Sequence, residues 1–284
     1  MRTAVKWLAR IVGAVVLLIV VACAILYFRG SSAVSGPFET EAVTLAVPSD
    51  SAAIANGRYL SNILACTECH GADLSGQVMA DAPPFLAVAS NLTPAGVGGS
   101  YTDVDWERAI RQGVGSDGRG LLIMPSESYN NVSDEEVADL IAFLKQAEAV
   151  ENPLPRSEVR ALGKLIAGTG APIMIPDLVG NWGPRPEMPA PGATAEWGEY
   201  RMKTVCMVCH GLNLEGGQPP DPASPLAPPL SSVKGWTLEG FRTAMRTGVT
   251  PGGKELDDYF MPWRAFRHMT DTELEALYLA LQAR

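Results

Sequence analysis

"LACTECHGADLSG", residues 64–76, and "TVCMVCHGLNLEGG", residues 204–217, share one arrangement of side chains. In each string two cysteines stand three positions apart, and a histidine directly follows the second. The residues are Cys66, Cys69 and His70 in the first string, and Cys206, Cys209 and His210 in the second. The whole chain of 284 residues holds five cysteines and three histidines. The pattern therefore indicates one chemistry, shared by a cysteine pair and its adjacent histidine, that is used twice.

The similarity between the two strings continues along the chain in the same order. The matched segments are residues 57–77 with 198–218, 82–86 with 227–230, 105–114 with 239–249, 124–125 with 261–262, and 133–144 with 270–281. Their spacings are nearly equal. The sequence therefore predicts two copies of one domain of about 90–100 residues.

The last matched segment predicts a helix in each copy. Apolar residues recur at i, i+3, i+4 and i+7, as Val137, Leu140, Ile141 and Leu144 and as Leu274, Leu277, Tyr278 and Leu281. Ser133 with Glu136, and Thr270 with Glu273, predict capping boxes at the two helix starts. Shorter helices are expected over residues 105–112 and 239–247, and no stretch shows sustained period-two alternation. We therefore expect an all-α fold.

Changes in composition and the ends of the repeat predict the boundaries of the domains, the strap and the spacer. The first domain covers residues 52–150 and the second covers residues 193–284, with a proline-rich linker or strap over residues 151–192. Residues 31–51 are polar and predict a flexible spacer. Residues 1–30 precede it and contain the most apolar stretch of the chain.

That stretch, residues 11–28, has no charged side chain. At about 1.5 Å rise per residue a helix of this length spans roughly 27 Å, close to the hydrocarbon thickness of a bilayer. Basic residues precede it and the first acidic residue is Glu39, so the positive-inside rule places the N-terminus in the cytoplasm. We expect a single-pass anchor in the inner membrane with a periplasmic body. A cleaved signal peptide and lipidation at Cys23 are the alternatives.

A C-x-x-C-H string is the attachment signature of c-type heme. The two thiols lie one helical turn apart, so each can form a thioether with one heme vinyl group, and the histidine is then placed to bind the iron. Structural zinc sites pair C-x-x-C units about 15–20 residues apart, and a thioredoxin-type motif needs a βαβ context. Neither fits this chain, so two covalently bound hemes c are predicted.

A methionine occupies the same place in each copy as a candidate sixth ligand. Met124 follows His70, and Met261 follows His210, by a similar number of residues, and each methionine precedes a proline and the capped helix. His268 is the only histidine outside the two strings, and we interpret it as a surface residue. The sequence therefore predicts His70 with Met124 and His210 with Met261 as axial pairs.

Together with "NLTP" (residues 91–94), "IRQGV" and the "SDEE" helix, these motifs resemble c-type cytochrome domains. The tandem copies, the "LGKL" strap and the anchor resemble diheme cytochrome c subunits of membrane-bound periplasmic dehydrogenases. The resemblance covers about residues 52–144 and 194–281. It implies that the carbonyl groups of Pro84 and Pro229 hold the histidine rings. It also implies that Arg111 and Arg246 are candidates for contact with the heme propionates, with surface ion pairs as the alternative.

The expected function is outer-sphere electron transfer by a non-catalytic subunit, with redox proteins and the membrane as partners and no small-molecule substrate. The net charge of −9 excludes nucleic acid as an expected partner, because phosphate binding needs a basic face. A diheme subunit of a cbb-type heme–copper oxidase is the nearest alternative. A diheme peroxidase or thiosulfate-oxidising cytochrome, and a zinc or adhesion module without heme, are the others.

Overall fold

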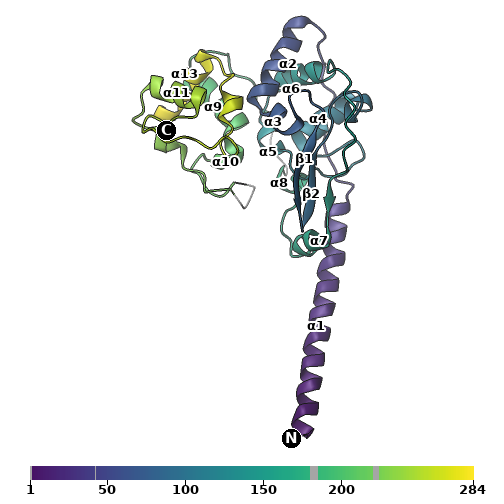
Figure 1. The fold of residues 1–284 in the computed structure, drawn as a ribbon. Helices are drawn as coiled ribbons and strands as arrows, with labels where there is room; N and C mark the ends of the chain where they lie inside the picture. Colours follow the sequence, from purple (N-terminus) through teal and green to yellow (C-terminus); the bar gives the residue numbers. More distant parts are fainter. Residues whose placement is uncertain (1, 42, 180–184, 220–223) are drawn as a thin grey trace.

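The long N-terminal helix α1 (Arg2–Ser35) stands apart from the rest of the molecule. The computed structural model describes residues 2–41, 43–179, 185–219 and 224–284. Helix α1 projects away from a two-lobed head, with the N-terminus at its far end (Figure 1). Among the described residues it is the one helix long and apolar enough to cross a membrane, and a signal sequence near an N-terminus has the same features.

The first half of the head is built on the crossing of helices α2 (Ser51–Ile63) and α6 (Asp134–Leu144). Gly57 permits this close crossing, because a Cβ added there would lie 2.0 Å from the carbonyl oxygen of Asp139. Asp50 caps the start of α2 by accepting hydrogen bonds from the N–H groups that follow it. The smaller elements between the two helices are α3 (Cys66–His70), the 3₁₀ turn η1 (Val97–Gly99), α4 (Asp103–Gln112) and α5 (Ser126–Tyr129).

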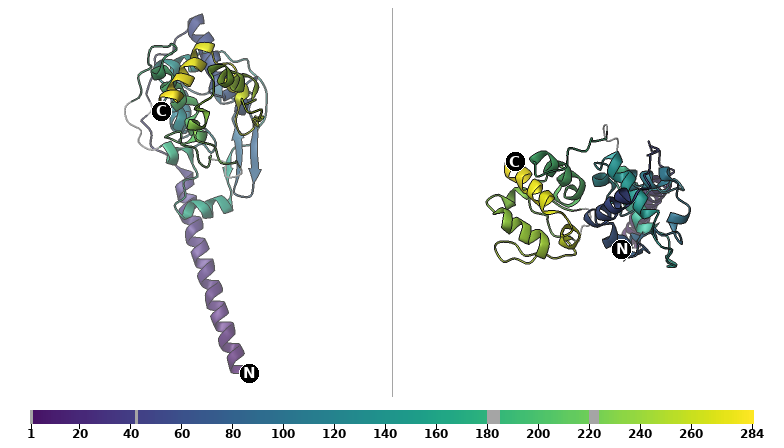
Figure 2. Two further views of the ribbon diagram at one scale, coloured as in Figure 1. Left: turned by 90° about the vertical axis from the view of Figure 1, so that its left-hand side faces the viewer. Right: turned by 90° about the horizontal axis from the view of Figure 1, so that it is seen from above.

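The second half repeats this order of elements. They are α9 (Ala195–Val205), α10 (Met207–His210), the 3₁₀ turn η2 (Leu230–Val233), α11 (Leu238–Thr247), α12 (Trp263–Phe266) and α13 (Asp271–Ala283). Helices α9 and α13 cross at Gly198, where an added Cβ would lie 2.0 Å from the carbonyl oxygen of Ala276. The same close crossing of a first and a last helix therefore occurs in both halves, which lie side by side when seen from above (Figure 2).

A small antiparallel sheet is added to the helical plan. Strands β1 (Gln77–Ala82) and β2 (Phe85–Ala89) form a hairpin, and β3 (Glu158–Val159) pairs with β2. The expectation of helices and loops alone missed these strands. Each is six residues or shorter, and β3 comes from the distant strap, so the sequence carries too little alternation to reveal them.

The strap and the expected spacer are both folded onto the first half. After β3, the strap forms α7 (Ala161–Gly168) and α8 (Ile175–Val179), while residues 180–184 lie outside the described residues. In the expected spacer, α1 continues to Ser35. The N–H of Val43 then donates to the buried carboxylate of Glu107 at 3.1 Å, and Leu45 is 8% exposed. The prediction of a flexible spacer is therefore wrong, because these residues are tied to α4.

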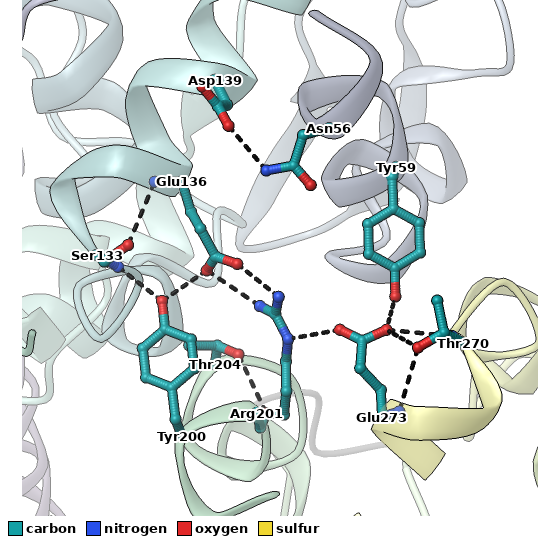
Figure 3. A network of polar contacts seen from close by, with 10 residues as sticks. All are labelled: Asn56, Tyr59, Ser133, Glu136, Asp139, Tyr200, Arg201, Thr204, Thr270 and Glu273. Atoms are coloured by element: carbon teal, nitrogen blue, oxygen red, sulfur yellow. Dashed lines mark hydrogen bonds and ion pairs between the residues drawn. The ribbon is translucent and has the colours of Figure 1, made fainter. Parts of the chain in front are cut away.

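A buried network of charged and phenolic groups joins the two halves (Figure 3). Arg201 on α9 lies between two carboxylates, donating to Glu136 of α6 at 3.0 Å and to Glu273 of α13 at 2.9 Å. The hydroxyl of Tyr200 donates to Glu136 at 2.6 Å, and the hydroxyl of Tyr59 on α2 contacts Glu273. A single cluster of buried apolar side chains also includes residues of both halves. The halves are thus packed together rather than linked loosely.

The network explains a difference between the two predicted capping boxes. In α13 the box is complete, since Thr270 accepts from the N–H of Glu273 and the Glu273 carboxylate accepts from Thr270. In α6 the hydroxyl of Ser133 accepts from the N–H of Glu136, as predicted. The carboxylate of Glu136 turns instead to Arg201, so only half of that box forms.

Candidate functional site

The first C-x-x-C-H string forms α3 directly after α2. Ala65 separates the two helices by adopting a left-handed conformation, with φ at 57°. Cys66 and His70, at the two ends of α3, are both buried. Gly76 brings the following loop back against α3, and its N–H donates to the carbonyl oxygen of His70 at 2.7 Å. An added Cβ at Gly76 would lie 2.4 Å from the carbonyl oxygen of Ala89, so the loop needs glycine there.

The ring of His70 is held by a backbone carbonyl. Its Nδ1 lies 2.7 Å from the carbonyl oxygen of Ser90. Donation from Nδ1 leaves the lone pair of Nε2 free, which is the state that a metal-binding imidazole requires. Burial lowers the pKa of His70, opposed in part by the contact with Ser90, so the ring is neutral at pH 7.

Pro84, predicted to hold this ring, lies at the turn between β1 and β2. Its carbonyl accepts a hydrogen bond from the N–H of Arg160 at 2.9 Å. The prediction paired residues 82–86 with 227–230 through their prolines. In the structure Leu92 and Leu230 are equivalent. The N–H of Leu92 donates to the carbonyl oxygen of Leu74, and the N–H of Leu230 donates to that of Leu214, and each acceptor lies four positions after the histidine of its half. The prediction for Pro84 is therefore wrong, and Ser90 has the role.

The four residues predicted to bind the first heme line one cavity of about 550 Å³. They are Cys66, Cys69, His70 and Met124. The remaining wall is mostly apolar or aromatic and comes from α4, α5 and α6, the end of β2, the loops on either side of α4, and residues 152–157 of the strap. It includes Trp106, Ile110, Tyr129, Leu140 and Leu144. Segments that are distant in sequence thus place two thiols, an imidazole and a thioether around one apolar space.

Two features of the cavity wall test whether heme fits. The Nε1–H of Trp106 is buried and has no hydrogen-bond partner in the protein, although Trp106 lines the cavity. A buried donor without an acceptor costs about 1–3 kcal/mol, which a bound group with acceptor oxygens would relieve. Arg119 and Arg156 also line the cavity, with side chains 65% and 79% exposed, and both share Asp117 of the same wall, at 3.7 and 3.6 Å. An apolar space with an unpaired indole donor and two exposed arginines that share one aspartate fits an apolar macrocycle that carries carboxylates.

Arg111, predicted to contact a propionate, is not among the residues that line the cavity. Its guanidinium is fully buried, with Nη1 2.6 Å from Asp134 and Nη2 donating to the carbonyl oxygen of Val132 at 2.6 Å. Arg246 lies at the equivalent place, 2.8 Å from Asp271. Asp134 and Asp271 are the first residues of α6 and α13. In the structure Arg111 and Arg246 therefore form ion pairs with the first residues of α6 and α13.

The second C-x-x-C-H string repeats the contacts around its histidine, although Val205 ends α9 in a helical conformation where Ala65 is left-handed. The N–H of Gly216 donates to the carbonyl oxygen of His210 at 2.8 Å, as Gly76 does in the first half. Nδ1 of His210 lies 2.8 Å from the carbonyl oxygen of Pro228. Pro229 was predicted for this contact, so the prediction is wrong by one residue. Burial lowers the pKa of His210, which is therefore neutral at pH 7.

Met261 and Met124 have equivalent surroundings. Each is followed by a proline that starts a short helix, α12 or α5, and its carbonyl oxygen accepts a hydrogen bond from the residue after that proline. Both side chains pack against the shared apolar cluster. The predicted partner of each histidine thus lies in the same loop of each half.

The four thiols are buried or half-buried and protonated. Burial raises the pKa of Cys66 and that of Cys206 to about 12 each, and it raises the pKa values of Cys69 and Cys209 as well. Zinc sites use thiolates. In the part of the chain that the structure describes, no group of three or more His, Cys, Asp and Glu is placed to hold a metal ion. Two neutral thiols at the wall of an apolar cavity suit thioether bonds to an apolar group.

Comparison with known proteins identifies the first half. Residues 54–148 match the family model described as cytochrome c. They include both cysteines of α3, His70 and Met124. The chain contains a cytochrome c domain. Covalently bound heme c is the cofactor of this family, and it is the group that the cavity of the cytochrome c domain fits.

Curated relatives match longer parts of the chain. The fructose dehydrogenase cytochrome subunit of Gluconobacter japonicus is 29% identical over 145 residues, which are 48% of this chain and 29% of that protein. The cytochrome c subunit of the quinone alcohol dehydrogenase of Gluconacetobacter polyoxogenes is 26% identical over 180 residues, 57% of this chain and 36% of that protein. A nicotinate dehydrogenase subunit of Pseudomonas putida is 24% identical over 260 residues, 84% of this chain and 21% of that protein. The chain thus spans about a fifth to a third of the length of these relatives.

Four cavity residues were missed from the sequence: Ser90, Trp106, Arg119 and Arg156. Ser90 acts through its backbone, so its side chain gives no signal. Trp106 aligns with Phe241 on the equivalent helix and looks like a core residue in both copies. Arg156 comes from the strap, and nothing in its spacing connects it with the cytochrome c domain. The correct alignment of the loops is set by backbone hydrogen bonds from Leu92 to Leu74 and from Leu230 to Leu214, which no residue type in the sequence reveals.

Proposed function

We propose that the chain is a membrane-anchored diheme cytochrome c that relays electrons for a dehydrogenase complex. The observation that carries this proposal is the single cavity shared by Cys66, Cys69, His70 and Met124. Two thiols provide covalent attachment, and an imidazole and a thioether provide two axial ligands. These four side chains are sufficient to attach and ligate one heme that exchanges electrons without binding a substrate.

The residues of the cytochrome c domain have separate roles in this proposal. Cys66 and Cys69 attach the cofactor, and His70 offers Nε2 to the iron while Ser90 fixes its ring and tautomer. Met124 supplies the second axial ligand. The bound heme supplies an iron that changes between the ferric and ferrous states. Because His70 and Met124 would both hold the iron, the chain is expected to carry electrons and not to transform a substrate.

The same proposal is extended to a second heme at Cys206, Cys209, His210 and Met261. Its support is the repeated order of elements, the matching contacts at the histidine carbonyl and ring, and the equivalent methionine loop. The alignment with the nicotinate dehydrogenase subunit leaves out only about 45 residues of this chain, so it includes both C-x-x-C-H strings. The two halves are therefore proposed to be two domains of one type.

A dehydrogenase as the partner is proposed from the names of the relatives. Two of them are cytochrome subunits of a fructose and an alcohol dehydrogenase, and a third is a subunit of a nicotinate dehydrogenase. The acidic composition of this chain suits docking of a partner with a basic patch.

Helix α1 is proposed to be a retained anchor, with its N-terminus in the cytoplasm and the head in the periplasm. Trp7 and Tyr27 stand near the two ends of the apolar run and are 20 residues apart, which is about 30 Å along a helix. Aromatic side chains at this separation match the two interfaces of a bilayer. The close packing of α1 against the strap at Gly30 and Gly168 also favours retention over cleavage.

The direct test is affinity purification of the tagged full chain from gently solubilised membranes, followed by mass spectrometry of the chains that co-purify. We expect a dehydrogenase catalytic subunit. Adding its substrate should then reduce the hemes of this chain, which visible absorption reports. A Cys66→Ala/Cys69→Ala variant, which retains the second string, serves as the control for signal from the first heme.

Co-purification with subunits of a heme–copper oxidase in place of a dehydrogenase would contradict the proposed partner. A colourless full chain from cells with intact heme maturation would contradict the cytochrome assignment itself.

A further inference from the structure

Helix α7 buries its small residues and exposes its large apolar residues, the opposite of what is usual for a helix of a water-soluble protein. Its buried residues are the small ones, Gly163, Ala167 and Gly168. Its large apolar residues point outward, with Leu162 46% and Ile166 41% exposed. They are four positions apart, so they share one face of the helix. Nothing in the folding of the chain itself accounts for this exposed face.

The small residues allow α7 to lie directly against α1. A Cβ added at Gly30 of α1 would lie 1.7 Å from the carbonyl oxygen of Lys164, and one added at Gly168 would lie 2.0 Å from the carbonyl oxygen of Leu26. The Nζ of Lys164 lies over the ring of Tyr27, 5.6 Å from its centroid. Close approach of two helices through small residues is typical of helices that pack within or beside a membrane.

The contact occurs at the end of the apolar run of α1. That run ends at Phe28, and α7 meets α1 around Leu26 and Gly30. Figure 1 shows α7 on the side of the head from which α1 leaves. If α1 spans the membrane, this level is the boundary between acyl chains and headgroups. The lysine of α7 and the nearby Arg29 are then placed among lipid phosphates, and the exposed leucine and isoleucine lie at the acyl boundary.

Helix α7 is also fixed to the wall of the heme cavity. The N–H of Arg160, just before α7, donates to the carbonyl oxygen of Pro84, and its guanidinium lies 2.7 Å from Asp81. Strand β3 leads into α7 and pairs with β2, and β2 leads to Ser90, which holds His70. A continuous set of backbone contacts therefore links α7 to the first histidine.

We propose that α7 is a lipid-contact helix, which lies in the interfacial layer of the bilayer with Leu162 and Ile166 facing the acyl chains. It holds the cytochrome c domain against the membrane surface, with the first cavity at a set height and orientation. This inference rests on the proposed role of α1 as a membrane span.

The test is quenching by lipid of a fluorophore attached at single positions of the full, heme-loaded chain. Ile166→Cys, Leu162→Cys and Leu279→Cys are each made in a Cys23→Ser background, labelled with nitrobenzoxadiazole and reconstituted in vesicles. Fluorescence is compared between vesicles with and without lipids that carry a nitroxide near the headgroup. Quenching by the hemes is the same in both vesicle types and cancels in the ratio. Leu279 on α13 is the matched control, because it is an exposed leucine of similar exposure, 39%, that lies in the other half.

We expect the labels in Ile166→Cys and Leu162→Cys to lose most of their fluorescence in nitroxide vesicles, and the label in Leu279→Cys to lose little. Equal, small losses at all three positions would overturn the proposal. A fourth variant, Leu18→Cys in the middle of α1, separates the lipid-contact helix from the membrane span on which it rests. If lipids with a nitroxide deep in the acyl chain quench the Leu18→Cys label while the two α7 labels stay unquenched, only the proposal of a lipid-contact helix is contradicted. An unquenched Leu18→Cys label contradicts the membrane span as well.

Discussion

At the scale of single residues, the two proposed heme sites share their proposed axial pairs and differ at an equivalent position of α4 and α11. His70 and His210 are each held by a backbone carbonyl, and each is matched with a methionine in an equivalent loop. The fourth residue of α4 is Trp106, whereas the fourth residue of α11 is Phe241. This position therefore offers an indole donor in the first half and none in the second, so the two hemes are expected to differ in potential.

Replacing Met124 with histidine tests its role as an axial ligand. Methionine ligation raises the potential of a heme relative to bis-histidine ligation. Met124→His should therefore keep its heme but lower one midpoint potential, measured by a redox titration followed in visible absorption. Met79→His, on the exposed strand β1, is the control and should leave both potentials unchanged. Unchanged potentials in Met124→His would remove that ligand assignment.

Removing the indole donor tests the orientation of Trp106 toward the bound group. Trp106→Phe should lower the free energy of unfolding of the heme-loaded protein by about 1.5–3 kcal/mol, the range for a hydrogen bond to a charged group. Denaturant unfolding followed by heme absorption measures this. The control is Trp197→Phe, which removes another buried Nε1 without a partner, one that does not line this cavity. Equal effects of the two substitutions would show that Trp106 acts only through packing.

Residue-level prediction succeeded where side chains carry the chemistry and failed where the backbone does. The cysteines, His70 and Met124 were named from spacing, and the structure brings them to one cavity. The carbonyl groups of Ser90 and Pro228 leave no trace in their side chains, so similarity of nearby prolines selected the wrong partner. The prediction for Arg111 rested on its position near a helix end. The sequence does not show the direction of its side chain, which points to Asp134.

At the scale of elements, the close crossing of the first and last helix defines each half. Periodicity and capping residues predicted α4, α6, α11 and α13 close to their observed bounds. The hairpin was not predicted because its strands are six residues or shorter and show too little alternation. Strand β3 was not predicted because it pairs with β2 across about 70 residues of sequence. The role of the crossing glycines, Gly57 and Gly198, follows only from their neighbours in the structure.

Replacing either crossing glycine with alanine should lower the free energy of unfolding by a similar amount. Gly57→Ala and Gly198→Ala each place a Cβ 2.0 Å from a carbonyl oxygen of the partner helix. Each should lower the free energy of unfolding by about 1–3 kcal/mol, as overpacking does. Gly252→Ala has no atom within 4 Å of its new Cβ and is the control, expected to be neutral. A neutral effect of Gly198→Ala alone would show that the second crossing is looser than the first.

At the scale of the whole molecule, the buried network around Arg201 holds the halves together. Its guanidinium and the two carboxylates of Glu136 and Glu273 have side chains no more than 7% exposed. This contact was not predicted, because the two glutamates read as capping residues of separate helices. The order of domains was predictable from the repeat, whereas the interface between them was not, since it depends on side chains with no shared spacing.

Arg201→Met should lower the free energy of unfolding by about 3–5 kcal/mol at neutral pH, because it leaves buried carboxylates without their cation. Burial already raises the pKa of Glu273, and loss of the arginine raises it further. A carboxyl group with a raised pKa in the folded state binds more protons folded than unfolded, so stability falls as pH rises through that pKa. The deficit of Arg201→Met should thus be smaller near about pH 5 than near about pH 8.

The exposed pair of Arg284 and Glu199 provides the control for this prediction. Arg284→Met should change stability by less than about 1 kcal/mol at either pH. Thermal unfolding at the two pH values measures both variants. A deficit of Arg201→Met that does not vary with pH would contradict the raised pKa of Glu273.

The central claim is that both halves carry heme, and the most direct measurement is the number of hemes bound to one chain. The full chain is expressed with heme-maturation machinery, and its intact mass and pyridine hemochrome absorbance are measured beside those of Cys206→Ala/Cys209→Ala. We predict two covalent hemes in the original chain and one in the variant. One heme in both proteins would contradict the claim.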